Sequence, residues 1–106
     1  MKISILNLAP LRQGENFKDA IDAMIRLAKK ADELGYERYW IAEHHNMKSV
    51  ASSATQLLIQ RTLDNTSNIR VGSGGVMLPN HSPYIVAEQY GTLETLYPDR
   101  VDLGLG

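Results

Sequence analysis

Cysteine is missing from all 106 residues of the sequence. Its absence excludes a disulfide framework, a thiolate metal site and a cysteine nucleophile. The sequence also lacks an excess of either charge, because 11 basic and 12 acidic residues give a formal net charge of -1. No basic stripe is present, so we expect neither nucleic acid nor an anionic membrane surface as a partner.

Long apolar runs are missing as well. No stretch of the sequence is apolar over the length that is needed to span a bilayer. Residues 1–10 carry only Lys2 as a basic residue and run into an alternating apolar pattern, which is typical of a strand and not of a signal peptide. We therefore expect a cytoplasmic protein with no membrane-spanning segment.

The composition is that of a globular domain. Hydrophobic residues make up 43% and charged residues 22%, which excludes a disordered tail. The chain is long enough for one small domain with its own core, and no linker or low-complexity segment divides it. We treat residues 1–106 as a single unit.

Short β-branched runs alternate with longer helical patterns. Strands are predicted for residues 3–8, 38–42, 69–77 and 100–105, each of which ends at proline, glycine or polar residues. The first helical pattern begins at Asn16 as N-cap and ends at Gly35. Its apolar residues recur every three or four positions, at Phe17, Ile21, Met24, Ala28 and Ala31.

Two further helical patterns follow. The second begins with residues 53–56, which have the form of a capping box, and runs to about Asn65. The third is capped by Ser82, with Pro83 at its first helical position. Its predicted buried side consists of Val86, Tyr90, Leu93 and Tyr97.

The resulting order of elements is β-α-β-α-β-α-β. Connections that contain a helix of this length imply parallel strands with right-handed crossovers. Two α/β architectures use this order, the closed (β/α)8 barrel and the open doubly wound sheet. A complete barrel takes roughly 250 residues, so this chain would supply about three and a half of its eight β/α units.

Acid-base groups follow one of the predicted strands, and glycines lie near the end of another. Residues 43–46, Glu-His-His-Asn, end the second strand, and residues 72–75, Gly-Ser-Gly-Gly, lie late in the third. In parallel β/α folds these strand ends meet on one face, where active sites are built. Histidine titrates near neutrality and can transfer protons, but polar residues at a strand end are equally explained by local hydrogen bonds.

A metal site at Glu43, His44 and His45 is the weaker reading, because neighbouring residues of a strand point to opposite faces. The glycines lack the dinucleotide-binding fingerprint and the lysine of a phosphate-binding loop. Either a tight barrel corner or a ligand against the backbone explains them.

Other candidate residues are expected to be structural. Aromatic side chains beside a strand are more often core than ligand platform, so Tyr36, Tyr39 and Trp40 are assigned to the core. Arg100 follows Pro98 and precedes a strand, at the end opposite the expected site, and is predicted to be an ion-pair partner with a structural role.

Three segments together resemble the bacterial luciferase-like flavin-dependent monooxygenases. Residues 40–45, Trp-Ile-Ala-Glu-His-His, are similar to the strand-two signature of that family. Residues 71–79, followed by Ser82-Pro83, are similar to its strand-three segment, and residues 87–106 to its third helix and fourth strand. The resemblance extends from residue 1 to residue 106, as the amino-terminal fragment of a single barrel domain.

The resemblance implies a parallel (β/α)8 TIM barrel and an enzyme that uses reduced FMN and O2 to oxygenate a small organic substrate. His44 would be the catalytic histidine, suited to proton transfer and to hydrogen bonding near the flavin peroxide. Glu43 matches the neighbouring acidic position and would set the charge or orientation of His44. Gly74 and Gly75 fall where the family often has a non-prolyl cis peptide beside the flavin ring, so Glu43, Gly74 and Gly75 are the predicted cofactor-binding residues.

The family also implies partners. A separate flavin reductase would supply the reduced FMN, the flavin phosphate would be held by the second half of the barrel, and a homo-oligomer is expected. A deazaflavin coenzyme is the less favoured cofactor. The alternative function is a non-catalytic flavin-binding or truncated barrel module that needs a partner chain, because an open half-barrel exposes sheet edges.

Overall fold

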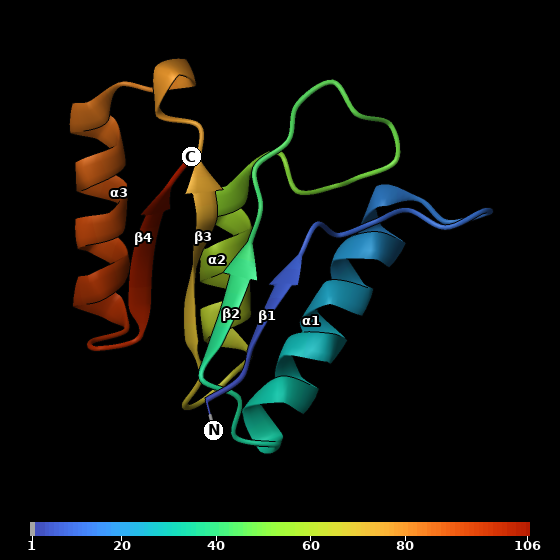
Figure 1. Ribbon diagram of the computed structural model, residues 1–106, viewed down its shortest axis with the longest axis horizontal. Coiled ribbons are helices and arrows are strands. Elements are labelled where there is room, and N and C mark those ends of the chain that lie inside the picture. The colour runs from blue at the N-terminus through green and yellow to red at the C-terminus, as the bar shows by residue number, and fades with distance from the viewer. Residues whose placement is uncertain (1) are drawn as a thin grey trace.

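The computed structural model describes residues 2–106 as a four-stranded sheet that is covered by three α-helices (Figure 1). In chain order the elements are β1 (Ser4–Asn7), α1 (Phe17–Glu33), β2 (Arg38–Ile41), α2 (Thr55–Asp64), β3 (Arg70–Val76), the 3-10 turn η1 (Leu78–Asn80), α3 (Pro83–Leu96) and β4 (Val101–Leu105). The predicted order of elements is therefore confirmed.

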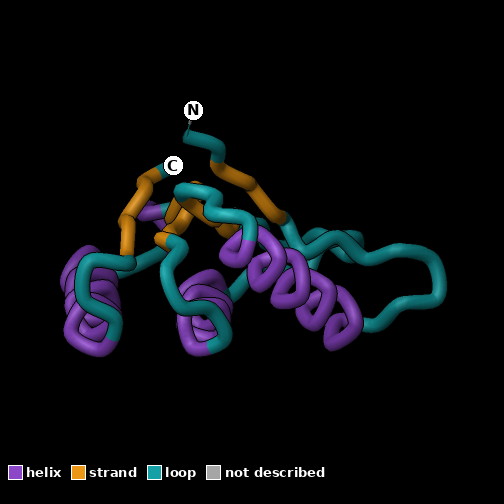
Figure 2. Tube along the Cα trace, turned by 90° about the horizontal axis from the view of Figure 1, so that it is seen from below, coloured by secondary structure: helices purple, strands orange, loops and turns teal. Residues whose placement is uncertain are grey.

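The strands lie in sequence order, β1-β2-β3-β4, and every neighbouring pair is parallel. All three helices lie on the same side of the sheet (Figure 2). A doubly wound sheet reverses its strand order at a switch point and carries helices on both faces. Sequential strands with one covered face are the arrangement of a segment of a (β/α) barrel.

The hydrophobic core lies between the sheet and the helices. Successive strand residues point to opposite faces, so Tyr39, Ile41 and Val71 are fully buried in the core. The helices contribute buried side chains from all three elements: Ala20, Met24, Ala28 and Ala31 from α1, Leu58, Ile59 and Leu63 from α2, and Val86, Tyr90 and Leu93 from α3.

Two side chains predicted to be buried or core do not belong to it. Phe17, at the first position of α1, is 56% exposed, because this end of the helix extends past the tip of β1 (Figure 1). Trp40 is half-buried on the uncovered face of the sheet, since it alternates with Tyr39, whose hydroxyl donates to the Met24 carbonyl of α1 at 2.9 Å. Tyr36 packs against the core as expected.

The helix ends follow the predictions in two cases of three. Asn16 and Asp19 form a reciprocal capping box at α1, with N···O distances of 2.9 and 3.0 Å. Gly35 follows this helix with a φ of +78°, the left-handed conformation that ends many helices. Ser82 caps α3, accepting from the Ile85 amide at 3.4 Å, and Pro83 occupies the first helical position.

The capping box predicted at residues 53–56 is wrong. Ala54 is the N-cap of α2 and offers no side-chain hydrogen bond. Thr55 instead donates its hydroxyl to the Ala42 carbonyl at 3.0 Å, which ties the start of α2 to the segment after β2. A tertiary contact has replaced the local cap.

Charged residues are concentrated at the amino ends of the strands. On the uncovered face, Asp102 accepts from Arg38 Nε at 3.0 Å and from Arg70 Nε and Nη2 at 3.0 and 2.9 Å. Arg100 has the predicted structural role, but it forms no ion pair with a carboxylate among residues 2–106. Its guanidinium donates to the Ile69 and Thr66 carbonyls, at 3.1 and 3.2 Å, close to the carboxyl end of α2.

Candidate functional site

The carboxyl ends of β2 and β3 meet at one edge of the sheet, as the parallel order requires. Glu43 lies two residues beyond β2, and one of its carboxylate oxygens accepts from the backbone amide of Met77, directly after β3, at 3.2 Å. The acidic-histidine segment and the glycine-rich strand end are therefore neighbours in space.

The Glu43 carboxylate is the buried centre of this edge. Its side chain is only 1% exposed. Besides the Met77 amide it contacts two imidazoles, His45 Nε2 at 2.6 Å and His81 Nε2 at 2.9 Å from each oxygen. Burial alone would raise the pKa of this carboxyl, but the hydrogen bonds from His45, His81 and Met77 outweigh it and hold the pKa below its ordinary value.

His44 does not contact this carboxylate in the way that the sequence suggested. Glu43 was expected to orient His44, yet its partners are His45 and His81. The imidazole of His44 is half-buried and makes no side-chain hydrogen bond within residues 2–106, while its backbone amide donates to the Ser52 carbonyl at 2.9 Å. Consecutive residues point in different directions here, so only one of the two histidines reaches Glu43.

The loop that carries His44 is fastened to the loop after β1. Ser52 donates its hydroxyl to the Leu8 carbonyl at 2.9 Å, and the Ala51 amide donates to the Ala9 carbonyl at 2.9 Å. Pro10 and Val50 form an antiparallel bridge. These backbone contacts hold residues 42–54 over the carboxyl ends of β1 and β2 (Figure 1).

Gly74 and Gly75 of β3 have different surroundings. The Gly74–Gly75 peptide bond is cis, as the family resemblance implied. A β-carbon on Gly75 would lie 2.8 Å from the Gly106 amide, so the backbone of the next strand excludes a side chain there. A β-carbon on Gly74 would face the uncovered side of the sheet, 3.1 Å from the Trp40 β-carbon and 3.4 Å from Leu6.

His81 is a site residue that could not be judged from the sequence, because it lies far along the chain from Glu43. It follows η1, whose tight turn brings the ring back to the carboxylate that also holds Met77. The available signal was its position in the β3–α3 loop, at the same edge of the sheet as Glu43.

Residues 2–106 contain no group of three or more histidine, cysteine, aspartate or glutamate side chains that could hold a metal ion. In the same residues no helix combines the length and the apolar character that a membrane crossing requires.

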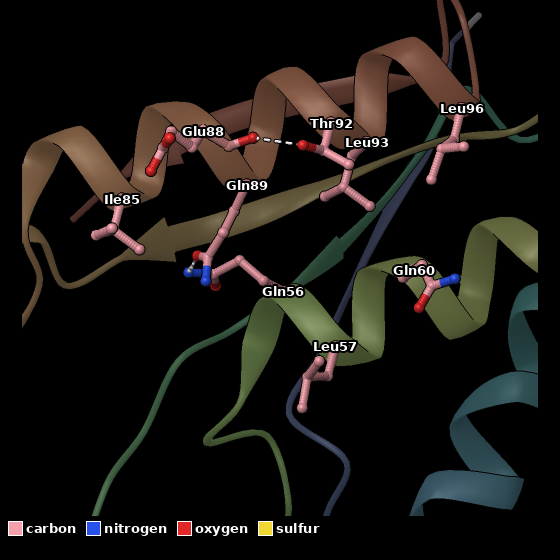
Figure 3. A pocket seen from close by; sticks show the side chains of 9 residues that line it. All are labelled: Gln56, Leu57, Gln60, Ile85, Glu88, Gln89, Thr92, Leu93 and Leu96. Atoms are coloured by element: carbon pink, nitrogen blue, oxygen red, sulfur yellow. Dashed lines mark hydrogen bonds between the residues drawn. The ribbon is translucent and has the colours of Figure 1, made fainter.

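A surface groove lies away from this edge of the sheet. A groove of about 540 Å³ runs between α2 and α3, with Gln56, Leu57, Ile85, Gln89 and Leu96 among its lining residues (Figure 3). None of the predicted site residues lines it. A smaller pocket of about 450 Å³ at the amino ends of these helices includes His81 in its wall.

Comparison with known sequences gives a match along the whole chain. The sequence pattern of the luciferase-like monooxygenases matches residues 1–106. An uncharacterized protein of Bacillus subtilis, YddN, is 64% identical over 104 residues, which are 98% of this chain and 31% of that protein. A luciferase-like monooxygenase of Escherichia coli K12 is 55% identical over 103 residues, 97% of this chain and 31% of that protein. The chain thus spans about a third of the length of these relatives.

Solved structures agree. Apo-MsnO8 superposes with a TM-score of 0.97 and 50% identity, over 99% of this chain and 32% of that one. The oxygenating constituent of 3,6-diketocamphane monooxygenase from Pseudomonas putida, a type II Baeyer-Villiger enzyme in complex with FMN, superposes with a TM-score of 0.92 and 26% identity, over 100% of this chain and 29% of that one. A coenzyme F420 dependent reductase from Methanopyrus kandleri, 24% identical with a TM-score of 0.77 over 99% of this chain and 26% of that one, shares the fold.

Proposed function

Because the chain belongs to the luciferase-like monooxygenase family and forms the first β/α units of its barrel, we propose that the full-length protein oxygenates a small organic substrate with reduced FMN and O2. One observation supports this most. The histidine segment after β2 and the Gly74–Gly75 end of β3 lie next to each other at one edge of the sheet. A flat, redox-active ligand needs acid-base groups close by and a strand end whose glycines leave room for the ring.

The uncovered face of the sheet fits an aromatic ring. Gly74 has no side chain, and next to it lie Trp40 and Leu6, of which Leu6 is 56% exposed. We propose that these three residues, with Gly75 supporting the backbone from the β4 side, line the isoalloxazine ring. FMN, when bound, supplies the electrons and activates O2.

His44 is the proposed proton-transfer residue. Glu43 is a poor candidate, because it is buried and three donors keep it ionised. The His44 ring has no partner among residues 2–106 that would occupy its nitrogens, and its backbone is fixed by Ser52. Either ring nitrogen of His44 can therefore contact a bound ligand.

FMN is proposed in preference to a deazaflavin coenzyme. The FMN complex belongs to a structural neighbour that is 26% identical, whereas the F420-dependent neighbour supports the fold alone. A separate flavin reductase, self-association into a homo-oligomer and a cytoplasmic location belong to the same proposal and rest on the family resemblance.

The test uses the full-length protein with photoreduced FMN and 18O2. N-acetyl-S-methylcysteine is the first probe, because an N-acetyl-S-alkylcysteine monooxygenase of B. subtilis is 43% identical over 106 residues, 100% of this chain and 32% of that protein. We expect one 18O atom in the product, and a loss of about 100-fold in product formation in His44→Ala. Unchanged product formation in His44→Ala would remove this residue from the mechanism.

A non-catalytic module predicts a different result. In that case the full-length protein binds reduced FMN but incorporates no 18O into this probe or into a cyclic ketone, the substrate type of Baeyer-Villiger enzymes. His45→Ala is the matched control for His44→Ala, because His45 is the next residue in the chain and its ring is occupied by a contact with Glu43.

A further inference from the structure

The Glu43 carboxylate, the Met77 amide and the His81 ring form a closed set of contacts at the end of β3. Met77 N donates to one carboxylate oxygen at 3.2 Å, and His81 Nε2 lies 2.9 Å from both oxygens. Between them the turn is closed by Asn80 N to the Met77 carbonyl and His81 N to the Leu78 carbonyl, both at 2.9 Å. Residues 77–81 thus begin and end on the same buried carboxylate.

The other side of this strand end is held by β4. The Gly106 amide donates to the Val76 carbonyl at 2.8 Å, and Gly75 packs so closely on residues 105–106 that a β-carbon would collide with them. The Gly74–Gly75 segment therefore lies between two anchors, β4 on one side and Glu43 on the other. Without the contact to Glu43, only β4 would hold this segment in position.

The charge of Glu43 is what makes the anchor work. An ionised carboxylate only accepts hydrogen bonds, so it can satisfy His45, His81 and Met77 at once. Each imidazole presents Nε2 to the carboxylate, so each needs a proton on Nε2 and leaves Nδ1 for other contacts. A neutral amide in place of the carboxylate would face at least one of these donors with a donor of its own.

We propose that Glu43 and His81 are positioning residues of the flavin site: together they hold the Met77 amide, and through it the Gly74–Gly75 end of β3. The contacts themselves are observed in the structure, whereas their effect on flavin binding rests on the proposed function. His45 touches the same carboxylate from an exposed loop and does not belong to the 77–81 turn. Its removal therefore leaves the turn closed.

Two measurements on the full-length protein test this proposal. In protein labelled with 15N-methionine, the Met77 amide is identified by its loss in Met77→Leu and its hydrogen exchange is followed by NMR. We expect His81→Ala to speed this exchange about tenfold, because a hydrogen bond to a charged group is lost from the turn. His81→Asn, whose amide can still donate, should recover part of the protection, and His45→Ala should change it less than about threefold.

The second measurement is the dissociation constant of reduced FMN under anaerobic conditions. His81→Ala should raise it about tenfold, while the pH profile of turnover keeps its shape, because the proposed proton-transfer residue His44 is unaltered. Circular dichroism of each variant confirms that the fold is retained.

The outcomes distinguish the two parts of the proposal, the positioning of the 77–81 turn and its effect on flavin binding. An unchanged Met77 exchange rate in His81→Ala overturns the positioning role, whatever the flavin result. Faster exchange with unchanged FMN affinity overturns the link between this turn and the flavin site. If the wild-type protein binds no FMN, the proposed function and the flavin consequence both fail, and the exchange of Met77 still decides whether Glu43 and His81 hold the turn.

Discussion

A carboxylate with several hydrogen-bond donors lies at each end of the sheet, half-buried for Asp102 and buried for Glu43, and the two differ in their partners. At the amino end Asp102 accepts from two arginines, and at the carboxyl end Glu43 accepts from two histidines and a backbone amide. Burial raises the pKa of both carboxyls, but the hydrogen bonds outweigh it, so both pKa values lie below the ordinary range.

The difference is in what the partners can do. Guanidinium groups stay charged at every accessible pH, so the amino end is a fixed ion cluster. Each imidazole offers one ring nitrogen to the carboxylate and leaves the other nitrogen for further contacts, so the carboxyl end can also contact a ligand. A carboxylate with several donors therefore supports the fold at one end of the sheet and organises the candidate site at the other.

The largest effect is expected at the amino end. Asp102→Ala leaves Arg38 and Arg70 without their shared partner, and both are partly buried on the uncovered face. We expect the free energy of unfolding of the full-length protein to fall by about 2 kcal/mol, below the figure for fully buried pairs because water reaches these side chains. Urea unfolding measures this loss.

The control for that variant is Lys18→Ala, which breaks an exposed i,i+4 ion pair with Asp22. It should cost less than about 0.5 kcal/mol. Equal losses for the two variants would show that Asp102 is an ordinary surface carboxylate.

A smaller, pH-dependent effect is expected at the carboxyl end. Glu43→Gln leaves one of three donors without an acceptor and should lower the free energy of unfolding by about 1 kcal/mol at pH 7. Because the folded-state pKa of Glu43 lies below the ordinary value of 4.5, this contribution is fully present above pH 4.5 and is lost as the pH falls through the folded pKa.

Asp102→Asn provides the comparison in the same experiment. Its ordinary value is 3.8 and its folded pKa is also lowered, so its contribution should persist unchanged down to about pH 3.8 before it is lost. Urea unfolding from pH 7 to pH 3 measures both differences from wild type. A Glu43 contribution that grows as the pH falls would contradict the ionised, three-donor arrangement.

Much of this arrangement could be read from the sequence because it depends on local periodicity and strand direction. The strand ranges, the Asn16 and Ser82 caps and the shared edge of Glu43 and Gly74 follow from patterns within a few residues and from parallel order. Glycine in a strand interior also signalled a close approach, which Gly75 makes with the backbone of residues 105–106.

The rest depended on tertiary contacts that no local pattern contains. Tyr39 and Trp40 were both predicted to be core, but neighbouring strand residues face opposite ways, and the position of the helices decides that Tyr39 is the one that enters the core. The sequence paired Glu43 with its neighbour His44, whereas one of its actual partners, His81, lies 38 residues further along the chain and reaches it through a turn. Similarly, at the start of α2 the Thr55 hydroxyl contacts the segment after β2 in place of the predicted local cap.

Gly74 allows the most direct test of the claim that this edge of the sheet receives a flat cofactor. In Gly74→Ala the added methyl group faces the uncovered side, beside Trp40 and Leu6, whereas Gly91→Ala adds one on α3 with no neighbour within 4 Å. The measurement is an anaerobic titration of the full-length variants with reduced FMN. We predict a dissociation constant at least about tenfold higher for Gly74→Ala and an unchanged one for Gly91→Ala. Wild-type affinity in Gly74→Ala would contradict a flavin ring at this face.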